Sequence, residues 1–271
     1  MKNVVLIGGK RRSGKDHIGS IFTKQFDFKR YSFATALKEY IYEVLKLDFD
    51  TGENMKNRND SVTMSFTDFS NDVDFMIRTL NYRLNKDKKF LYIEDIYNEY
   101  NAKYENCVKA EGFVFCLLKD MQALTEFDTI EKDLILEINV RLALQWLASY
   151  MKKLFGKDVW AIICLQDVLN SDIDNIVITD FRFPYEDFSE IDSLGNLNII
   201  SIQVLGKNRY DYDPLIDSHE SETALNDYKF DYIINNTVYG GPIILTVQIK
   251  AILNEKGLTW RIWKTKKLKE V

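Results

Sequence analysis

Cysteine is scarce in this 271-residue chain, which contains only Cys107, Cys116 and Cys164. No two of them form a C-x-x-C pair, and an odd number of widely spaced cysteines argues against a zinc site or a disulfide framework. We therefore expect the protein to work in a reducing compartment, the cytoplasm.

Long hydrophobic runs are missing as well. The first apolar run, residues 4–7, is far too short for a signal peptide, and no run approaches the ~18 apolar residues of a membrane span. Positive charge is not in excess either, since the net charge is −5 and the pI is about 5.3. We accordingly expect neither a membrane nor a nucleic acid as partner.

What the chain does contain is an alternation of strand-like and helix-like segments. Residues 3–8 form a continuous aliphatic run that ends in glycine, which is typical of a parallel strand buried on both faces, and residues 15–26 carry apolar side chains at helical spacing. Further strands are predicted at 28–33, 175–179, 197–205 and 232–234, and further helices at 36–47, 91–104, 131–151, 159–169, 185–194, 221–225 and 243–253. This alternation predicts an α/β fold with a mostly parallel sheet flanked by helices.

The stretch from residue 48 to residue 89 has a different character. It is dense in Asn, Asp, Thr and Ser, and its apolar residues follow no clear period. We expect one domain with a core at about 1–47 and 130–255, a mostly helical insert at 48–129 and a C-terminal extension at 256–271. Within the insert, residues 48–89 are predicted to be a mobile lobe that closes over a substrate.

The strongest motif is the glycine-containing stretch at residues 9–16. It matches the G-x-x-x-x-G-K pattern of a phosphate-binding loop and lies between a predicted buried strand and a predicted helix. In such a loop, backbone N–H groups and the helix dipole bind phosphate oxygens, while the lysine, here Lys15, neutralises the transferring phosphates. The chain has only 12 glycines, and three of them, Gly8, Gly9 and Gly14, lie around this one turn. A chance match to the pattern is therefore less plausible than in a glycine-rich protein.

Asp16 stands where this pattern usually has a serine or threonine that binds Mg²⁺. Its carboxylate can ligate the metal directly or through water. It can equally act as an acidic residue in the first turn of a helix, where it suits the helix dipole, and the sequence leaves both interpretations open. His17, beside it, is expected to be a surface residue near the nucleotide rather than a general base.

A second motif, Asp180-Phe-Arg182-Phe-Pro184, follows a predicted buried strand. Ligands bind at the carboxyl edge of open parallel sheets, so Asp180 is a candidate Mg²⁺ ligand and Arg182 a candidate phosphate contact. The alternative is a structural ion pair between the two. Glu186 nearby is a weaker candidate.

A third pattern, Arg141-x-x-x-Gln145, places an arginine and an amide on one face of a helix, where they can hold a phosphate and a base edge. Taken alone it is a weak signal, as are residues 219–222 and 235–236. Trp160 is more typical of a core than of a substrate contact.

In their order and spacing these motifs resemble the bacteriophage deoxynucleoside monophosphate kinases, a branch of the P-loop nucleoside monophosphate kinases. The resemblance covers roughly residues 1–47 and 130–255 and departs from the family at His17, where threonine is usual. The matching positions are Arg11 to Asp16, Arg141, Gln145, Lys157, Asp158, Trp160, Asp180, Arg182, His219, Ser221, Glu222, Asp231 and Asn235.

The resemblance implies a P-loop kinase-type sheet and the Mg²⁺-assisted transfer of a phosphoryl group from ATP to a deoxynucleoside monophosphate. Catalysis would fall to Lys15, Arg141, Asp180 and Arg182, and the metal to Asp16 and Asp180. ATP would be bound by Gly9, Arg11, Arg12, Ser13, Gly14, Lys15, Asp16, His17 and Asn235. The substrate would be bound by Lys38, Arg141, Gln145, Trp160, Glu186, Arg209, His219, Ser221 and Glu222. A homodimer, and the host cytoplasm as location for a viral protein, fit the same picture.

Two other functions remain open at this point. A cellular phosphomevalonate kinase shares the Ser-Gly-Lys-Asp loop, so the acceptor could be another phosphorylated small molecule. The chain could also be an idle nucleotide-binding module, although the joint presence of Lys15, Asp180 and Arg182 argues against idleness.

Overall fold

The chain folds into two compact units, each described here by itself. The computed structural model describes residues 1–84, 97–98, 101–102, 111–120, 134–191, 196–206, 220–237 and 241–258; at residues 120, 190, 220 and 221 only the backbone is described. Unit 1 comprises Met1–Phe33 and Cys164–Val271, and unit 2 comprises Ala34–Ile163.

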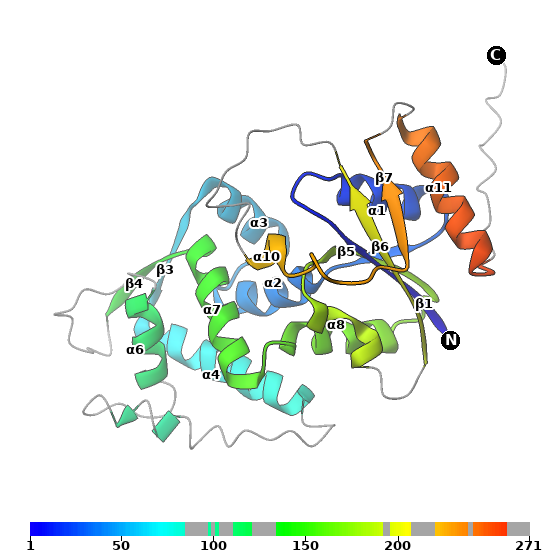
Figure 1. Ribbon diagram of the computed structural model, residues 1–271. Coiled ribbons are helices and arrows are strands. Elements are labelled where there is room, and N and C mark those ends of the chain that lie inside the picture. The colour runs from blue at the N-terminus through cyan, green and yellow to red at the C-terminus, as the bar shows by residue number, and fades with distance from the viewer. Residues whose placement is uncertain are drawn as a thin grey trace, which may run out of the picture. The chain divides into compact units, whose positions relative to one another are not determined.

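Unit 1 is built on a five-stranded sheet (Figure 1). The strand order is β2-β5-β1-β6-β7, and every neighbouring pair is parallel. The strands are β1 (Lys2–Gly8), β2 (Lys29–Tyr31), β5 (Asn175–Phe181), β6 (Leu197–Leu205) and β7 (Tyr232–Asn235). The predicted α/β class with a parallel sheet is therefore confirmed.

Helices α1 (Lys15–Gln25) and α11 (Gly241–Glu255) cover one face of this sheet. Phe22 of α1 and Ile249 of α11 are both fully buried and belong to one apolar cluster with strand residues such as Val5 and Ile7. Residues 4–7 of β1 are all fully buried, as expected for a central strand covered on both faces. The remaining short elements of unit 1 are the 3-10 turns Pro184–Glu186 and Phe188–Glu190 and helix α10 (Glu220–Thr223).

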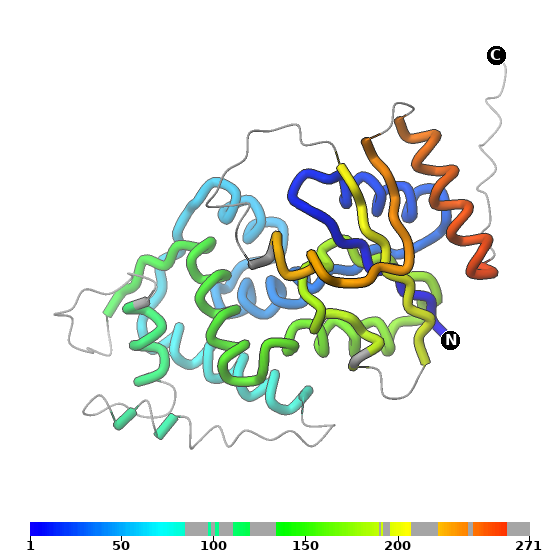
Figure 2. The backbone as a smooth tube through the Cα atoms, viewed as in Figure 1, coloured from blue at the N-terminus to red at the C-terminus, as the bar shows by residue number. Residues whose placement is uncertain are grey.

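Parallel pairing brings the carboxyl ends of the strands to one edge of the sheet. Gly8, the last residue of β1, is in register with Phe181 of β5 and Gln203 of β6. The chain runs from β1 to one side for β2 and β5 and then crosses to the other side for β6 and β7. The loop after β1, the blue trace in Figure 2, therefore lies at the point where the strand order reverses, which is where open sheets bind ligands.

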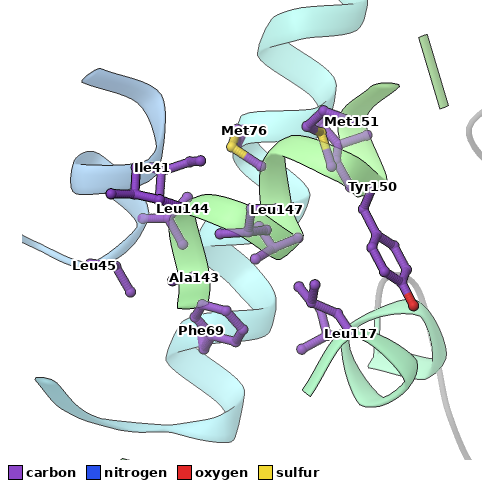
Figure 3. Packing of buried hydrophobic residues seen from close by; sticks show 14 of the residues in the cluster. Ile41, Leu45, Phe69, Met76, Leu117, Ala143, Leu144, Leu147, Tyr150 and Met151 are labelled. Carbon is purple, nitrogen blue, oxygen red and sulfur yellow. The ribbon is translucent and has the colours of Figure 1, made fainter. Parts of the chain in front are cut away.

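Unit 2 is mostly helical and has its own core. Figure 3 shows side chains of α2, α4, α6 and α7 packed together there, among them Ile41, Phe69, Leu117 and Leu147. Strands β3 (Ser61–Ser65) and β4 (Ile135–Asn139) pair antiparallel. The helices are α2 (Phe33–Val44), α3 (Phe49–Arg58), α4 (Phe66–Leu84), α6 (Glu111–Asp120), α7 (Val140–Phe155) and α8 (Val159–Asn170). Helix α2 begins at the last residue of unit 1's first segment, and α8 continues into unit 1 from Cys164.

Three local predictions are wrong. Residues 49–84 are regular rather than aperiodic, since α4 buries Phe69, Val73, Met76, Ile77 and Leu80 at helical spacing. The predicted helix 131–151 includes a strand at its start, because Leu136 and Ile138 are buried while their neighbours Ile135 and Glu137 are exposed, which is the period of a strand. The predicted helix 185–194 is replaced in its described part by the two 3-10 turns that follow Pro184.

The division between the units also differs from the boundaries expected from sequence. Residues 34–47 and 134–163 belong to unit 2 and share one core with the segment expected to be an insert. Among the described residues, no helix has the length and apolar character needed to cross a membrane.

Candidate phosphoryl-transfer site

The loop between β1 and α1 enters the helix through a left-handed glycine. Gly14 precedes α1 with a φ of 99°, a left-handed conformation that favours glycine. A Cβ at this position would lie 2.3 Å from Nδ2 of Asn236. That amide instead donates a hydrogen bond to the carbonyl oxygen of Ser13 at 2.8 Å and so ties the loop to the end of β7.

Lys15 lies folded back over the loop. Its Nζ donates to the carbonyl oxygens of Gly9 at 2.6 Å and Lys10 at 2.8 Å. Burial lowers the pKa of its ammonium, and the nearby Arg182 guanidinium lowers it further, against the opposing effect of three carboxylates, those of Glu222, Asp16 and Asp180. A lysine whose charge is disfavoured in this way gains from the arrival of an anion.

Arg182 follows β5 directly and is held next to the loop. Its Nη1 contacts Oε1 of Glu222 at 3.4 Å, while Oε2 of the same carboxylate accepts the backbone N–H of Arg11 at 2.5 Å. The Glu222 side chain is only 7% exposed. Nζ of Lys10 donates to the backbone carbonyl oxygen of Glu222 at 2.6 Å. Arg182 therefore has a carboxylate partner, Glu222, that lies far from it in the sequence.

Asp180 and Glu186 fix the backbone around this strand end. The Asp180 carboxylate accepts hydrogen bonds from Oγ of Ser32 at 2.7 Å and from the N–H of Phe33 at 3.2 Å. The buried Glu186 accepts the N–H groups of Arg182 at 2.7 Å and of Phe183 at 3.1 Å. Glu186, expected as a substrate contact, is thus placed to hold the backbone of Arg182.

Asp16 lies in the first turn of α1 and has an arginine partner that sequence reasoning missed. Nη2 of Arg30, from β2, contacts Oδ1 of Asp16 and donates to Oγ1 of Thr179 at 2.5 Å. Asp16 remains highly exposed. In the part of the chain that the structure describes, no cluster of three or more His, Cys, Asp and Glu residues could hold a metal ion by itself.

The other residues expected at the nucleotide are placed as follows. Arg11, Arg12 and His17 are exposed, whereas Ser13 is buried and its Oγ has no hydrogen-bond partner among the described residues. Asn235 accepts hydrogen bonds from Thr237 instead of reaching the loop, which is contacted by its neighbour Asn236.

The expected substrate residues of unit 2 form a separate group. Arg141 and Gln145 are both exposed and lie on one face of α7, as the four-residue spacing predicts, and Lys38 of α2 is half-buried. Trp160 is 5% exposed, and the centroid of its ring lies 6.4 Å from that of Tyr40. It is therefore a core residue of this unit. Arg209 and His219 lie outside the described residues, and the side chain of Ser221 is not described.

Sequence reasoning missed Arg30, and it named Asn236 only as part of a weak signal at residues 235–236. It expected Glu222 to bind the substrate, whereas the Glu222 carboxylate contacts Arg182 and the loop at Arg11. Only weak signals were available for them: Arg30 lies in a short strand, and Asn236 follows another strand by one residue. Their places depend on strand order, which brings β2 next to β5 and β7 next to β6.

Comparison with known protein families identifies the family of this chain. The family model described as deoxynucleotide monophosphate kinase matches residues 3–239, which include the loop, the β5 end and β7. The chain belongs to this family.

The kinase is thus a phosphotransferase that acts on deoxynucleotide monophosphates, and the suspected resemblance is confirmed. The match supports neither the phosphomevalonate kinase alternative nor an idle nucleotide-binding module. Comparison with curated proteins finds no match.

Proposed function

We propose that unit 1 of the kinase binds ATP through residues 9–16 and transfers its γ-phosphoryl group to a deoxynucleoside monophosphate. Lys15 and Arg182 stabilise the negative charge of the transferring group. Glu222 and Glu186 position Arg182 and do not react. Asn236, rather than Asn235, supports the loop at Ser13.

The observation that supports this proposal is the meeting of two cations at one end of the sheet. Arg182 lies close enough to Lys15 to lower the pKa of its ammonium. A polyphosphate at the loop relieves this repulsion. The buried hydroxyl of Ser13, which has no partner in the described part of the chain, would gain a phosphate oxygen as its acceptor.

Mg²⁺ fits the carboxylates at this site. Mg²⁺ is usually held by one or two protein carboxylates together with phosphate oxygens and water. Asp16 lies near the end of β5 that carries Asp180, since Arg30 contacts both Asp16 and Thr179, the residue before Asp180. The two carboxylates would hold the metal, which would neutralise charge on the ATP phosphates. Arg30 keeps the Asp16 carboxylate directed toward β5.

The reaction needs no general base. A phosphate oxygen of the monophosphate dianion attacks the γ-phosphorus, the bond to the β–γ bridging oxygen breaks, and ADP leaves with that electron pair. The chain's contribution is positioning and charge stabilisation. Arg141, Gln145 and Lys38 are proposed to bind the acceptor, and we also propose that the kinase works in the cytoplasm.

An assay of ATP-dependent ADP release across the common ribo- and deoxynucleoside monophosphates tests the proposal. We expect turnover with at least one deoxynucleoside monophosphate, a requirement for Mg²⁺, and loss of more than about 90% of kcat in Lys15→Ala, a cost above ~1.4 kcal/mol. Phosphomevalonate serves as the acceptor that represents the other kinase class. Turnover of phosphomevalonate alone, or full activity of Lys15→Ala, would overturn the proposal.

A further inference from the structure

Unit 2 contains a group of cations near one carboxylate, Glu53, and two of its members, Glu53 and Lys56, lie outside the residues that the resemblance covers. Glu53 of α3 contacts Nζ of Lys38 at 3.0 Å and Nζ of Lys56 at 2.6 Å. It also accepts the hydroxyl of Tyr42 at 2.6 Å. All three charged side chains are half-buried, with 20–26% of each exposed.

Close packing of α2 against α3 creates this group. Lys38 and Tyr42 are four residues apart and lie on one face of α2. Opposite them, α3 carries Gly52, whose missing Cβ would lie 2.6 Å from the ring of Tyr42. Because glycine stands there, α3 approaches the ring closely enough for Glu53 to reach the Tyr42 hydroxyl.

Helix α7 brings a third cation to the backbone of α3 at Lys56. Its first turn is tied to the end of α3, since Nδ2 of Asn139 donates to the carbonyl oxygen of Asn59 at 3.0 Å and the N–H of Val140 donates to that of Asp60 at 3.1 Å. Arg141, in that first turn, donates from Nη2 to the carbonyl oxygen of Lys56 at 3.3 Å. A guanidinium carries five donors, so this bond occupies only part of its capacity.

The charges of this group do not balance. Lys38, Lys56 and Arg141 contribute three positive charges, and Glu53 contributes one negative charge. Partial burial alone would raise the pKa of Glu53, but its hydrogen bonds from Lys56, Tyr42 and Lys38 outweigh burial and lower the pKa to about 2. Glu53 is therefore ionised at neutral pH, and the excess of two positive charges matches a phosphate monoester dianion.

We propose that Lys38, Lys56 and Arg141 bind the phosphate group of the monophosphate acceptor, and that Glu53 and Tyr42 position the two lysines. Gln145 lies one turn further along α7 on the same exposed face as Arg141, and we expect it to contact the nucleoside that carries this phosphate. This inference rests on the proposed function, and it adds Lys56, Glu53 and Tyr42 to the residues that recognise the acceptor.

Lys56→Met tests the proposal, since it removes the charge and keeps most of the apolar stem. Lys46→Met is the matched control, because Lys46 is also paired with a carboxylate of unit 2, Asp72 at 2.6 Å, but lies outside the group. We expect Lys56→Met to raise the acceptor KM at least tenfold, the usual loss for a hydrogen bond between charged groups, with little change in the KM for ATP. Lys56→Arg should recover part of the loss, and Lys46→Met should behave as wild type.

Calorimetry without ATP separates phosphate recognition from other effects. The ligands are the monophosphate that the wild type phosphorylates fastest, the matching deoxynucleoside and inorganic phosphate. Lys56→Met should weaken the binding of the monophosphate and of inorganic phosphate but leave the affinity for the deoxynucleoside unchanged. Equal weakening of nucleoside and monophosphate, or an unchanged acceptor KM in an active and folded Lys56→Met, would overturn this inference. If the wild type phosphorylates no monophosphate at all, the proposed function fails instead.

Discussion

At the scale of single residues, the Arg182 guanidinium contacts the Glu222 carboxylate, and its backbone N–H donates to Glu186. Arg182→Lys keeps a positive charge but loses the planar fork that can bridge two phosphate groups. We expect kcat to fall on the order of 100-fold, while the dissociation constant for ATP changes little. Steady-state kinetics and ATP titrations measure both quantities.

Glu222→Ala provides a cross-check on this arginine. If Glu222 acts by holding Arg182, the two substitutions should be strongly non-additive, so that Glu222→Ala costs much less kcat in the Arg182→Lys background than in the wild type. Additive effects on kcat would show that Glu222 acts elsewhere. A fall in melting temperature common to both backgrounds would report its support of the loop at Arg11.

Lys15 should give the kinase a characteristic pH dependence. Burial and the neighbouring Arg182 lower its pKa, whereas a bound phosphate favours the protonated form. ATP binding should therefore take up a proton and weaken as the pH rises through this lowered pKa. ATP dissociation constants measured between pH 7 and about 10 should rise at alkaline pH in the wild type. Lys15→Arg stays charged over that range, so a similar rise in this variant would assign the titration to another group.

Asp16 has two possible roles that its Mg²⁺ dependence separates. Asp16→Asn removes the negative charge but keeps the shape that Arg30 contacts. If Asp16 helps to bind the metal, the Mg²⁺ concentration for half-maximal rate should rise several-fold. Arg30→Gln, which removes the cationic partner of the Asp16 carboxylate, is measured in the same Mg²⁺ titration. An unchanged Mg²⁺ dependence in Asp16→Asn would leave only its favourable position in the first turn of α1.

At the scale of elements, α4 is a core helix of unit 2 although its sequence is rich in polar residues. Phe69 is fully buried, whereas Phe75 on the same helix is 61% exposed. Phe69→Ala should lower the free energy of unfolding by about 3–5 kcal/mol. Phe75→Ala should change it by less than about 0.5 kcal/mol. Urea unfolding curves measure both, and equal effects would contradict the burial of Phe69, whose surroundings Figure 3 shows, and the exposure of Phe75.

At the scale of the whole molecule, the two units should respond to different ligands. An ATP analogue should slow amide hydrogen exchange in the loop and α1, while the monophosphate should slow exchange in α3 and at the start of α7. The mobile lobe expected at 48–89 stays a prediction. Residues 49–84 share one apolar core with the rest of unit 2, so we expect any closure to move them together with that unit. If both ligands slowed amide exchange in the same unit only, the proposal that unit 1 binds ATP and unit 2 binds the monophosphate would be contradicted.

Local sequence patterns determined a substantial part of this protein. The strand at 2–8, the loop at 9–14 and the helix from Lys15 were predictable because glycine conformation, aliphatic runs and helical periodicity all act between near neighbours. The parallel sheet followed from the alternation of such segments. Arg182 and Asp180 followed from their place at a strand end, since the carboxyl edge of such a sheet binds ligands.

Tertiary structure decided what near neighbours cannot. Residues 135–139 form a strand because β3, at residues 61–65, pairs with them, and this pairing overrides a pattern that looked helical. Arg30 reaches Asp16, and Asn236 reaches Ser13, only because the strand order brings their strands to the same edge of the sheet. Likewise Glu53 meets Lys38 because α2 and α3 pack closely at Gly52. Each of these contacts depends on the arrangement of elements, which no local pattern in the chain records.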